Sequence, residues 1–184
     1  MRPKLALLLA SALLILPLIG SAAATEPPPL RVAVLDVERV RRSAAAVKVI
    51  RTQLSSYLDV YRTDTEKEEL EIRTAQEELT RKRATLSPEG YAEERRKLEA
   101  RLTQAQDRVQ RRRQALERVN MEAMEQVKQT LEAIVTEIAA ERQLTLILRK
   151  DQMVFAAPAI EVTDEVLQRL DTRLPSVRIS DPGG

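Results

Sequence analysis

The chain has no cysteine, histidine or tryptophan, and only three of its four glycines, Gly90, Gly183 and Gly184, lie beyond residue 20. Without cysteine there is no disulfide or thiolate nucleophile, and without histidine the commonest general base and usual zinc ligand are missing. A phosphate-binding loop needs clustered glycines, and none are clustered between a strand and a helix. The remaining acidic residues lie among basic ones, as on a solvated helix face. The composition predicts a protein that is not an enzyme and uses no metal, ATP or other cofactor.

The first 24 residues have the pattern of a secretory signal peptide. Arg2 and Lys4 precede an apolar run over residues 5–19, and small residues follow it. This run of about 15 residues is shorter than the roughly 20 needed to span a bilayer. We therefore expect residues 1–24 to be cleaved and the mature protein to be exported to the periplasm. An uncleaved membrane anchor is the alternative.

Charge is balanced over the mature chain but uneven along it. Loss of Arg2 and Lys4 leaves 28 Lys and Arg against 28 Asp and Glu, so nucleic acid is not an expected partner. Residues 95–118 carry nine basic against three acidic residues, a local charge of +6. The alternatives are a solvated arginine-rich surface and a basic rim that attracts acidic proteins or anionic lipid headgroups. The candidate rim residues are Arg81, Arg83, Arg95, Arg96, Arg111, Arg112 and Arg113.

Residues 44–142 predict a long antiparallel helical hairpin. Apolar residues recur every three or four positions on both sides of residues 87–90, where proline and glycine interrupt the pattern. Folding the chain at this point pairs positions whose numbers sum to 177, such as Leu79 with Leu98. Nearly every apolar position then meets another apolar one. We therefore expect a coiled-coil arm with its tip at residues 87–90.

The apolar pattern lapses midway along the predicted arm. Between Tyr61 and Ile72 the pairing positions are Asp64, Thr65 and Glu68. A local register shift and a flexible waist both remain open as interpretations of this lapse.

Short segments on either side of the hairpin predict a small β base. Residues 31–37 favour a strand, and residues 144–149 and 153–157 favour a β-hairpin. So few short strands cannot bury a core alone. We therefore predict that residues 25–43 and 143–173 form a discontinuous oligomerisation base. The side chains expected to be buried there between copies are Val32, Val34, Leu35, Ile147, Val154 and Phe155.

The C-terminal residues predict one short helix and a tail. Thr163 precedes two acidic residues and is the expected N-cap, and Pro175 lies where the helix should end. Residues 174–184 are expected to be disordered. The predicted fold class is therefore mainly α with a small β base, an α+β fold in which a coiled-coil hairpin projects from an oligomerisation base.

Two terminal motifs resemble the Skp/OmpH family of periplasmic chaperones. RVAVLDVERV at residues 31–40 looks like the family's opening strand and first helix, and LTLILRKDQMVFAAPAIEVTDEVLQRL at residues 144–170 is similar to its closing strands and last helix. The charged hairpin between them matches in layout and length. The resemblance implies a homotrimer whose strands join in one base. Its three hairpins would enclose a cavity for unfolded outer-membrane β-barrel proteins.

The resemblance and the predicted shape together favour an ATP-independent periplasmic holdase, which would keep unfolded outer-membrane proteins soluble during transit. A holdase needs many weak contacts, because one specific pocket would select a single sequence and hinder release. Long arms with thin apolar seams suit that task. The alternative is a coiled-coil scaffold or spacer of the cell envelope without chaperone activity.

Overall fold

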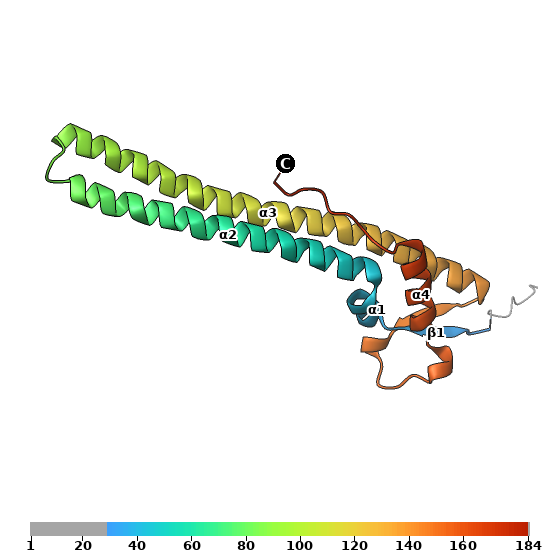
Figure 1. Cartoon of the computed structure of the whole chain (residues 1–184). Helices are drawn as coiled ribbons and strands as arrows, with labels where there is room; N and C mark the ends of the chain where they lie inside the picture. The colour runs from blue at the N-terminus through green and yellow to red at the C-terminus, as the bar shows by residue number, and fades with distance from the viewer. Residues whose placement is uncertain (1–28, 184) are drawn as a thin grey trace, which may run out of the picture.

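The chain folds as a long two-helix hairpin on a small base that contains both strands and helices (Figure 1). This computed structural model describes residues 29–183, so the predicted signal peptide lies outside the described residues. The predicted fold class, mainly α with a small β base and an antiparallel hairpin, is confirmed. No helix within residues 29–183 is long and apolar enough to cross a membrane.

The arm consists of α2 (Ala45–Lys82) and α3 (Pro88–Glu141). At about 1.5 Å per residue, their 38 and 54 residues give helices roughly 57 and 81 Å long. Residues 83–87 form the turn, and the Ser87 hydroxyl caps α3 by accepting a hydrogen bond from the Gly90 amide (3.1 Å). Pro88 and Gly90, expected at the tip, form the first turn of α3, where proline is tolerated because its missing N–H would have no helical partner.

Ion pairs across the arm fill the lapse in the apolar pattern. Arg112 Nη2 lies 2.9 Å from Asp64 Oδ2, and Arg108 pairs with Glu68. The residue numbers of each pair sum to 176, within one of the register expected from the sequence. Because α2 continues through this region as one helix, charged contacts replace apolar ones here without a break in the arm.

The base contains one two-stranded parallel sheet. β1 (Val32–Leu35) pairs with β2 (Leu146–Arg149), and the whole hairpin forms the connection that parallel strands require. The strand predicted at residues 153–157 is wrong, since irregular chain links the 3₁₀ turns η1 (Lys150–Gln152) and η2 (Pro158–Ile160). Residues 153–157 were expected to pair with residues 144–149, but they do not pair with β2, and the other side of β1 is taken by an isolated bridge from Val34 to Glu161.

Two short helices fasten the base to the arm. α1 (Val37–Ser43) follows β1, and α4 (Thr163–Arg173) packs against α1 and α3. Thr163 begins α4 and does not cap it, because its hydroxyl instead accepts a hydrogen bond from the Asp36 amide (2.9 Å). α2 has no side-chain cap of its own; the Asp171 carboxylate of α4 accepts the bond from the Ala45 amide (2.7 Å).

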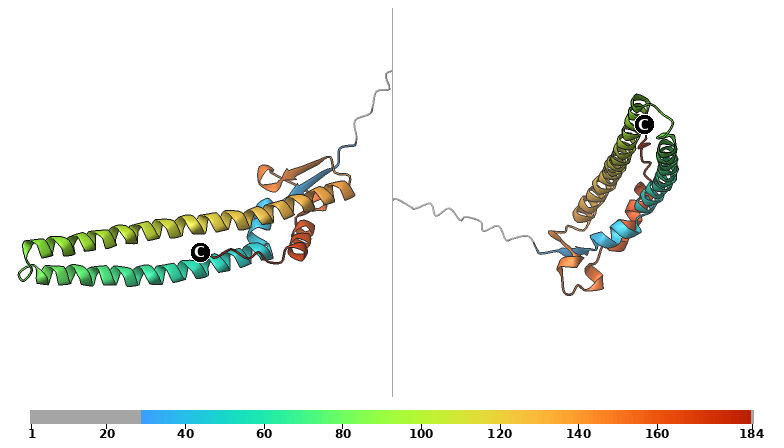
Figure 2. Two further views of the ribbon diagram at one scale, coloured as in Figure 1. Left: turned by 90° about the horizontal axis from the view of Figure 1, so that it is seen from above. Right: turned by 90° about the vertical axis from the view of Figure 1, so that its left-hand side faces the viewer.

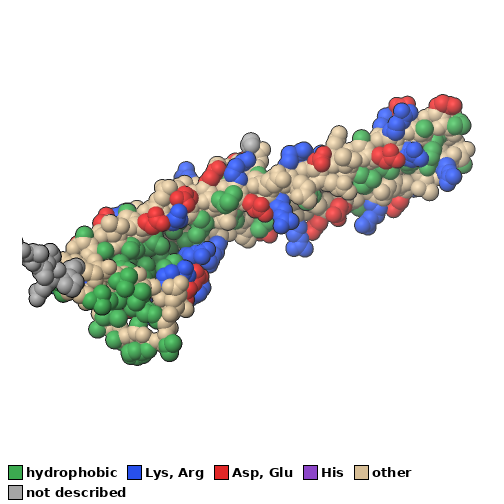
Figure 3. Space-filling view, turned by 180° about the vertical axis from the view of Figure 1, so that it is seen from behind, with side chains coloured by type: hydrophobic (Ala, Val, Ile, Leu, Met, Phe, Trp, Pro, Cys, Tyr) green, Lys and Arg blue, Asp and Glu red, His purple; other side chains and the backbone are tan. Residues whose placement is uncertain are grey.

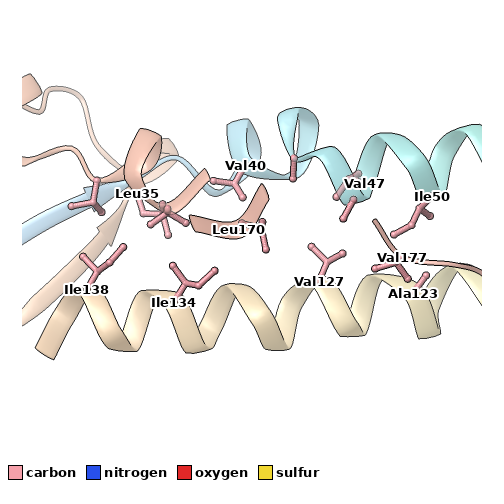
Figure 4. Close-up of a cluster of buried hydrophobic side chains, with 14 of the residues drawn as sticks. Leu35, Val40, Val47, Ile50, Ala123, Val127, Ile134, Ile138, Leu170 and Val177 are labelled. Atoms are coloured by element: carbon pink, nitrogen blue, oxygen red, sulfur yellow. The ribbon is translucent and has the colours of Figure 1, made fainter. Parts of the chain in front are cut away.

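The best-buried side chains gather where the arm meets the base (Figure 4). We call this set the base core; it includes Leu35, Val40, Ile50, Val127, Ile134, Ile138, Val166 and Leu170. Farther along the arm the apolar side chains are only partly covered, and Leu58 and Leu70 are 56% and 61% exposed. The arm is therefore anchored at one end by a packed core and carries accessible apolar surface along its length.

The segment after α4, residues 174–183, lies along the hairpin in extended conformation (Figures 1 and 2). We call this segment the tail. Val177 and Ile179 are only 3% and 9% exposed and join the base core. The prediction of a disordered tail is therefore wrong for residues 174–183, because burying these two side chains offsets the entropic cost of ordering the segment.

Candidate functional site

Large apolar side chains are exposed on the base, in the loop that follows β2. Val154 is fully exposed and Phe155 is 82% exposed, with Leu146 and Ile160 partly uncovered nearby in the sequence. From behind, hydrophobic side chains gather over the base more densely than over the outer arm (Figure 3). Exposed apolar patches of this kind mark surfaces that meet another protein or a membrane.

The predicted oligomer residues divide into an inner and an outer group. Val34 and Leu35 are buried within the chain itself, so the expectation that they face another copy is wrong. Leu35 belongs to the base core, with residues of α1, α4 and the arm, whereas Val34 bridges to Glu161, and the local sequence indicates neither. Val32 and Ile147 are half-buried, whereas Val154 and Phe155 are open to solvent.

The sheet also leaves a strand edge unpaired. β2 pairs with β1 on one side, and no described residue pairs with its other side. An open edge presents backbone amides and carbonyls that a strand from another chain can bind. Its position beside the loop that carries Val154 and Phe155 places both features on the base.

An apolar groove lies between α2 and α3 at the middle of the arm, with a volume of about 740 Å³. Leu54 and Leu58 of α2 and Val109 and Leu116 of α3 form its apolar walls. Charged side chains rim it on both helices, including Glu66, Glu69, Arg113 and Glu117. The groove results from helical spacing that leaves apolar side chains on this face without a third helix to cover them.

A second hollow, of about 460 Å³, is lined by arginines and by the end of the tail. We call it the basic hollow; its arginines are Arg108, Arg111, Arg112 and Arg118. The guanidinium of Arg112 lies 4.8 Å from the centre of the Tyr61 ring. Burial, and secondarily the charge of Asp181, raise the pKa of Tyr61 above its usual 10.0, while Arg112 opposes the rise. Tyr61 therefore stays neutral here and serves as a platform for Arg112.

The predicted basic rim is two separate groups. Arg81, Arg83, Arg95 and Arg96 lie near the tip, whereas Arg111–Arg113 lie at mid-arm, roughly 24 Å farther along α3 from Arg95. Several members are paired with acidic side chains: Arg95 with Glu99, Arg112 with Asp64 and Arg113 with Glu117. The basic rim therefore stays a prediction, and several of its arginines are already ion-paired.

Sequence reasoning did not select Arg108, Arg118 and Tyr61 as candidate site residues. Helical spacing could have found two of them, since Arg108 lies one turn before Arg111 and Arg118 lies two turns after it on the same face of α3. Tyr61 carried no such signal, since it read only as one apolar position among many. Within residues 29–183, no group of three or more acidic side chains is arranged to hold a metal ion.

Comparison with known proteins gives a family. The family model described as outer membrane protein (OmpH-like) matches residues 31–170. A solved structure from Caulobacter crescentus, described as that of a candidate outer membrane chaperone (OmpH-like), superposes with a TM-score of 0.76. It is 19% identical and covers 84% of this chain and 91% of its own, which establishes a shared fold. A search of curated proteins gave no match. Because the family model spans most of the chain, the protein belongs to the OmpH-like family.

Proposed function

We propose that the protein is an ATP-independent periplasmic holdase chaperone that binds unfolded outer-membrane β-barrel proteins. The observation that carries the proposal is an arm with a long, thin apolar surface, anchored to a base by a small core. The fold is shared with the candidate chaperone from Caulobacter crescentus, and the family match agrees with this role. Residues 1–24, as a cleaved signal peptide, would direct the chain to the periplasm.

Assembly into a homotrimer would use the base. Phe155 and Val154 are exposed on the loop after β2, where a second copy would cover them. The open edge of β2 would pair with backbone of a neighbouring subunit. Three arms held at one end would then leave a space between them for a client.

Client binding would use the arm. The apolar groove offers Leu58 and Val109, which are 56% and 43% exposed, to apolar segments of an unfolded chain. The arginines at the tip and at mid-arm would attract acidic segments and anionic lipid headgroups, with a strength that falls as salt rises. Contacts of this kind are weak one by one, so a client can leave once it folds elsewhere, without a nucleotide step.

The test is suppression of aggregation. An unfolded outer-membrane β-barrel protein is diluted from urea into buffer with and without the mature chain, and light scattering is followed. We expect scattering to fall and a soluble complex to elute on size exclusion, with light scattering giving three copies of this chain per client. A chain that leaves aggregation unchanged would act as a coiled-coil scaffold or spacer, which is the alternative function.

A further inference from the structure

The tail has the pattern of a β-strand. Val177 and Ile179 are buried against the hairpin, whereas Ser176, Arg178 and Ser180 face solvent. Alternation of buried and exposed side chains has the period of two that an extended chain imposes. The tail therefore lies on the hairpin as an extended peptide lies in a binding groove.

One side chain of the hairpin binds the tail's backbone. The Gln53 amide of α2 donates to the Val177 carbonyl (2.8 Å) and accepts from the Ile179 amide (3.2 Å). These are the two bonds that a residue of a neighbouring β-strand would supply to the same positions. Because only backbone atoms are recognised, any extended segment could receive them whatever its side chains.

The surface beneath the tail fits an extended chain. Ala115, Val119 and Ala123 follow one another at single-turn spacing on α3 and are buried. In the close-up, Val177 lies beside Ala123 and Ile50 (Figure 4). Side chains as small as alanine allow a backbone to approach a helix closely, and Ile50 supplies apolar contact.

We propose that this strip of the hairpin is a binding site for extended apolar segments of unfolded proteins, and that the tail is a tethered ligand that occupies it. The strip is defined by Ile50, Gln53, Ala115, Val119 and Ala123. The inference rests on the proposed function, because it assigns the strip to the holdase's clients. It adds that a client must displace the chain's own tail in order to bind there.

The chemistry of the proposed clients matches the tail. Membrane-spanning β-strands alternate apolar and polar residues with a period of two. Residues 177–180, Val-Arg-Ile-Ser, have the same alternation, with aliphatic side chains inward and polar ones outward. A client strand could thus place two aliphatic side chains where Val177 and Ile179 lie and receive the same bonds from Gln53.

Tethering sets how strongly the tail competes. An attached ligand is present at an effective concentration of about a millimolar, so weak contacts suffice to keep it bound. If the tail is docked about ten times more often than it is free, the client's apparent affinity for the strip falls about tenfold. A substitution that undocks the tail should therefore raise the client's apparent affinity about tenfold.

The experiment compares two neighbouring substitutions in the mature chain. Ile179→Asp places a charge on the buried side of the tail and should undock it, whereas the control Ser180→Asp places the same charge on the exposed side. One probe is a fluorescein-labelled peptide of residues 174–184, followed by fluorescence anisotropy. The other is an unfolded outer-membrane β-barrel protein diluted from urea. We expect the Ile179→Asp chain to bind both probes about tenfold more tightly than the parent, and the Ser180→Asp chain to behave as the parent does.

A third variant separates the strip from the tail. Adding Gln53→Ala to Ile179→Asp removes the two hydrogen bonds that the Gln53 side chain would make to the client's backbone. Most of the gain in affinity for both probes should therefore disappear. Gln110→Ala, at an exposed position of α3, is the matched control and should keep the gain.

The outcomes distinguish this inference from the proposed function. If the parent holds the barrel protein and Ile179→Asp binds it no more tightly, the tail is not a competitor and the inference is overturned. If the parent holds no barrel protein, the holdase proposal is overturned. Binding of the labelled peptide then tests, independently of any client, whether the strip is a peptide-binding site. Failure of the peptide to bind the Ile179→Asp chain would exclude such a site.

Discussion

Replacing Leu170 with alanine should lower the free energy of unfolding of the whole chain, although Leu170 belongs to an eleven-residue helix of the base. Its side chain is completely buried in the base core. The same helix caps α2 through Asp171 and pairs with α3 through Arg169 and Arg173. Leu170 is therefore the apolar anchor of the helix that holds the ends of both arm helices.

The magnitude follows from burial. Truncating a fully buried leucine to alanine costs about 3–5 kcal/mol, because the lost burial of apolar atoms and the cavity left behind both destabilise the folded state. Leu58 on α2 is 56% exposed, so the same substitution there removes less than half of the contact and leaves no closed cavity. We expect Leu58→Ala to cost about 1 kcal/mol or less.

The assay is equilibrium unfolding in urea, followed by far-UV circular dichroism. Both variants are measured at one protein concentration, because association would couple stability to concentration. The midpoint for Leu170→Ala should fall well below that of Leu58→Ala, with similar slopes. Equal losses in the two variants would refute the conclusion that the arm is anchored by the base core.

Three further predictions concern assembly, client binding and pH. Phe155→Glu should lower the oligomer mass measured by light scattering while helix content is kept, and Gln152→Glu on the same loop should not; a mass unchanged by Phe155→Glu would remove that side chain from the interface. Reversing Arg111–Arg113 to glutamate should weaken capture of an unfolded barrel protein at low salt and flatten its salt dependence, and affinity equal to the parent's at low salt would exclude these arginines from capture. Hydrogen bonds from Arg173 and Arg169 hold the pKa of Glu137 and of Glu141 below the usual 4.5, so these pairs stabilise α4 fully at pH values above 4.5, and that stability is lost as pH falls through the lowered pKa values. The double variant Glu137→Gln, Glu141→Gln should therefore show a smaller loss of stability in acid than the parent, whereas an unchanged acid transition in urea titrations at several pH values would contradict this linkage.

The hairpin was predictable because its signal is repeated many times. Apolar residues at helical spacing over residues 44–142 indicated two helices, and the interruption near Pro88 indicated one turn. Even the register agreed within one residue, as the pairs Arg108–Glu68 and Arg112–Asp64 demonstrate. Each further repeat strengthens the helical pattern, so one or two residues that depart from it do not change the predicted hairpin.

The base was predicted less well because short apolar segments are ambiguous. Residues 153–157 look like a strand, yet Glu161 bridges to β1 and they remain irregular and exposed. Val34 and Phe155 have similar apolar character in the sequence, but one is completely buried and the other is open to solvent. Which of two apolar residues is covered depends on segments that only the fold brings beside it.

The sequence by itself determined the absence of thiol and imidazole chemistry, the two long helices and the place where the chain reverses, because these follow from composition and local periodicity. Only the tertiary structure decided that Asp171 caps α2 and that Gln53 binds the tail. Each of these contacts joins residues more than a hundred positions apart through one or two hydrogen bonds. Such contacts leave no repeating pattern in the sequence, so they can be identified only from the folded structure.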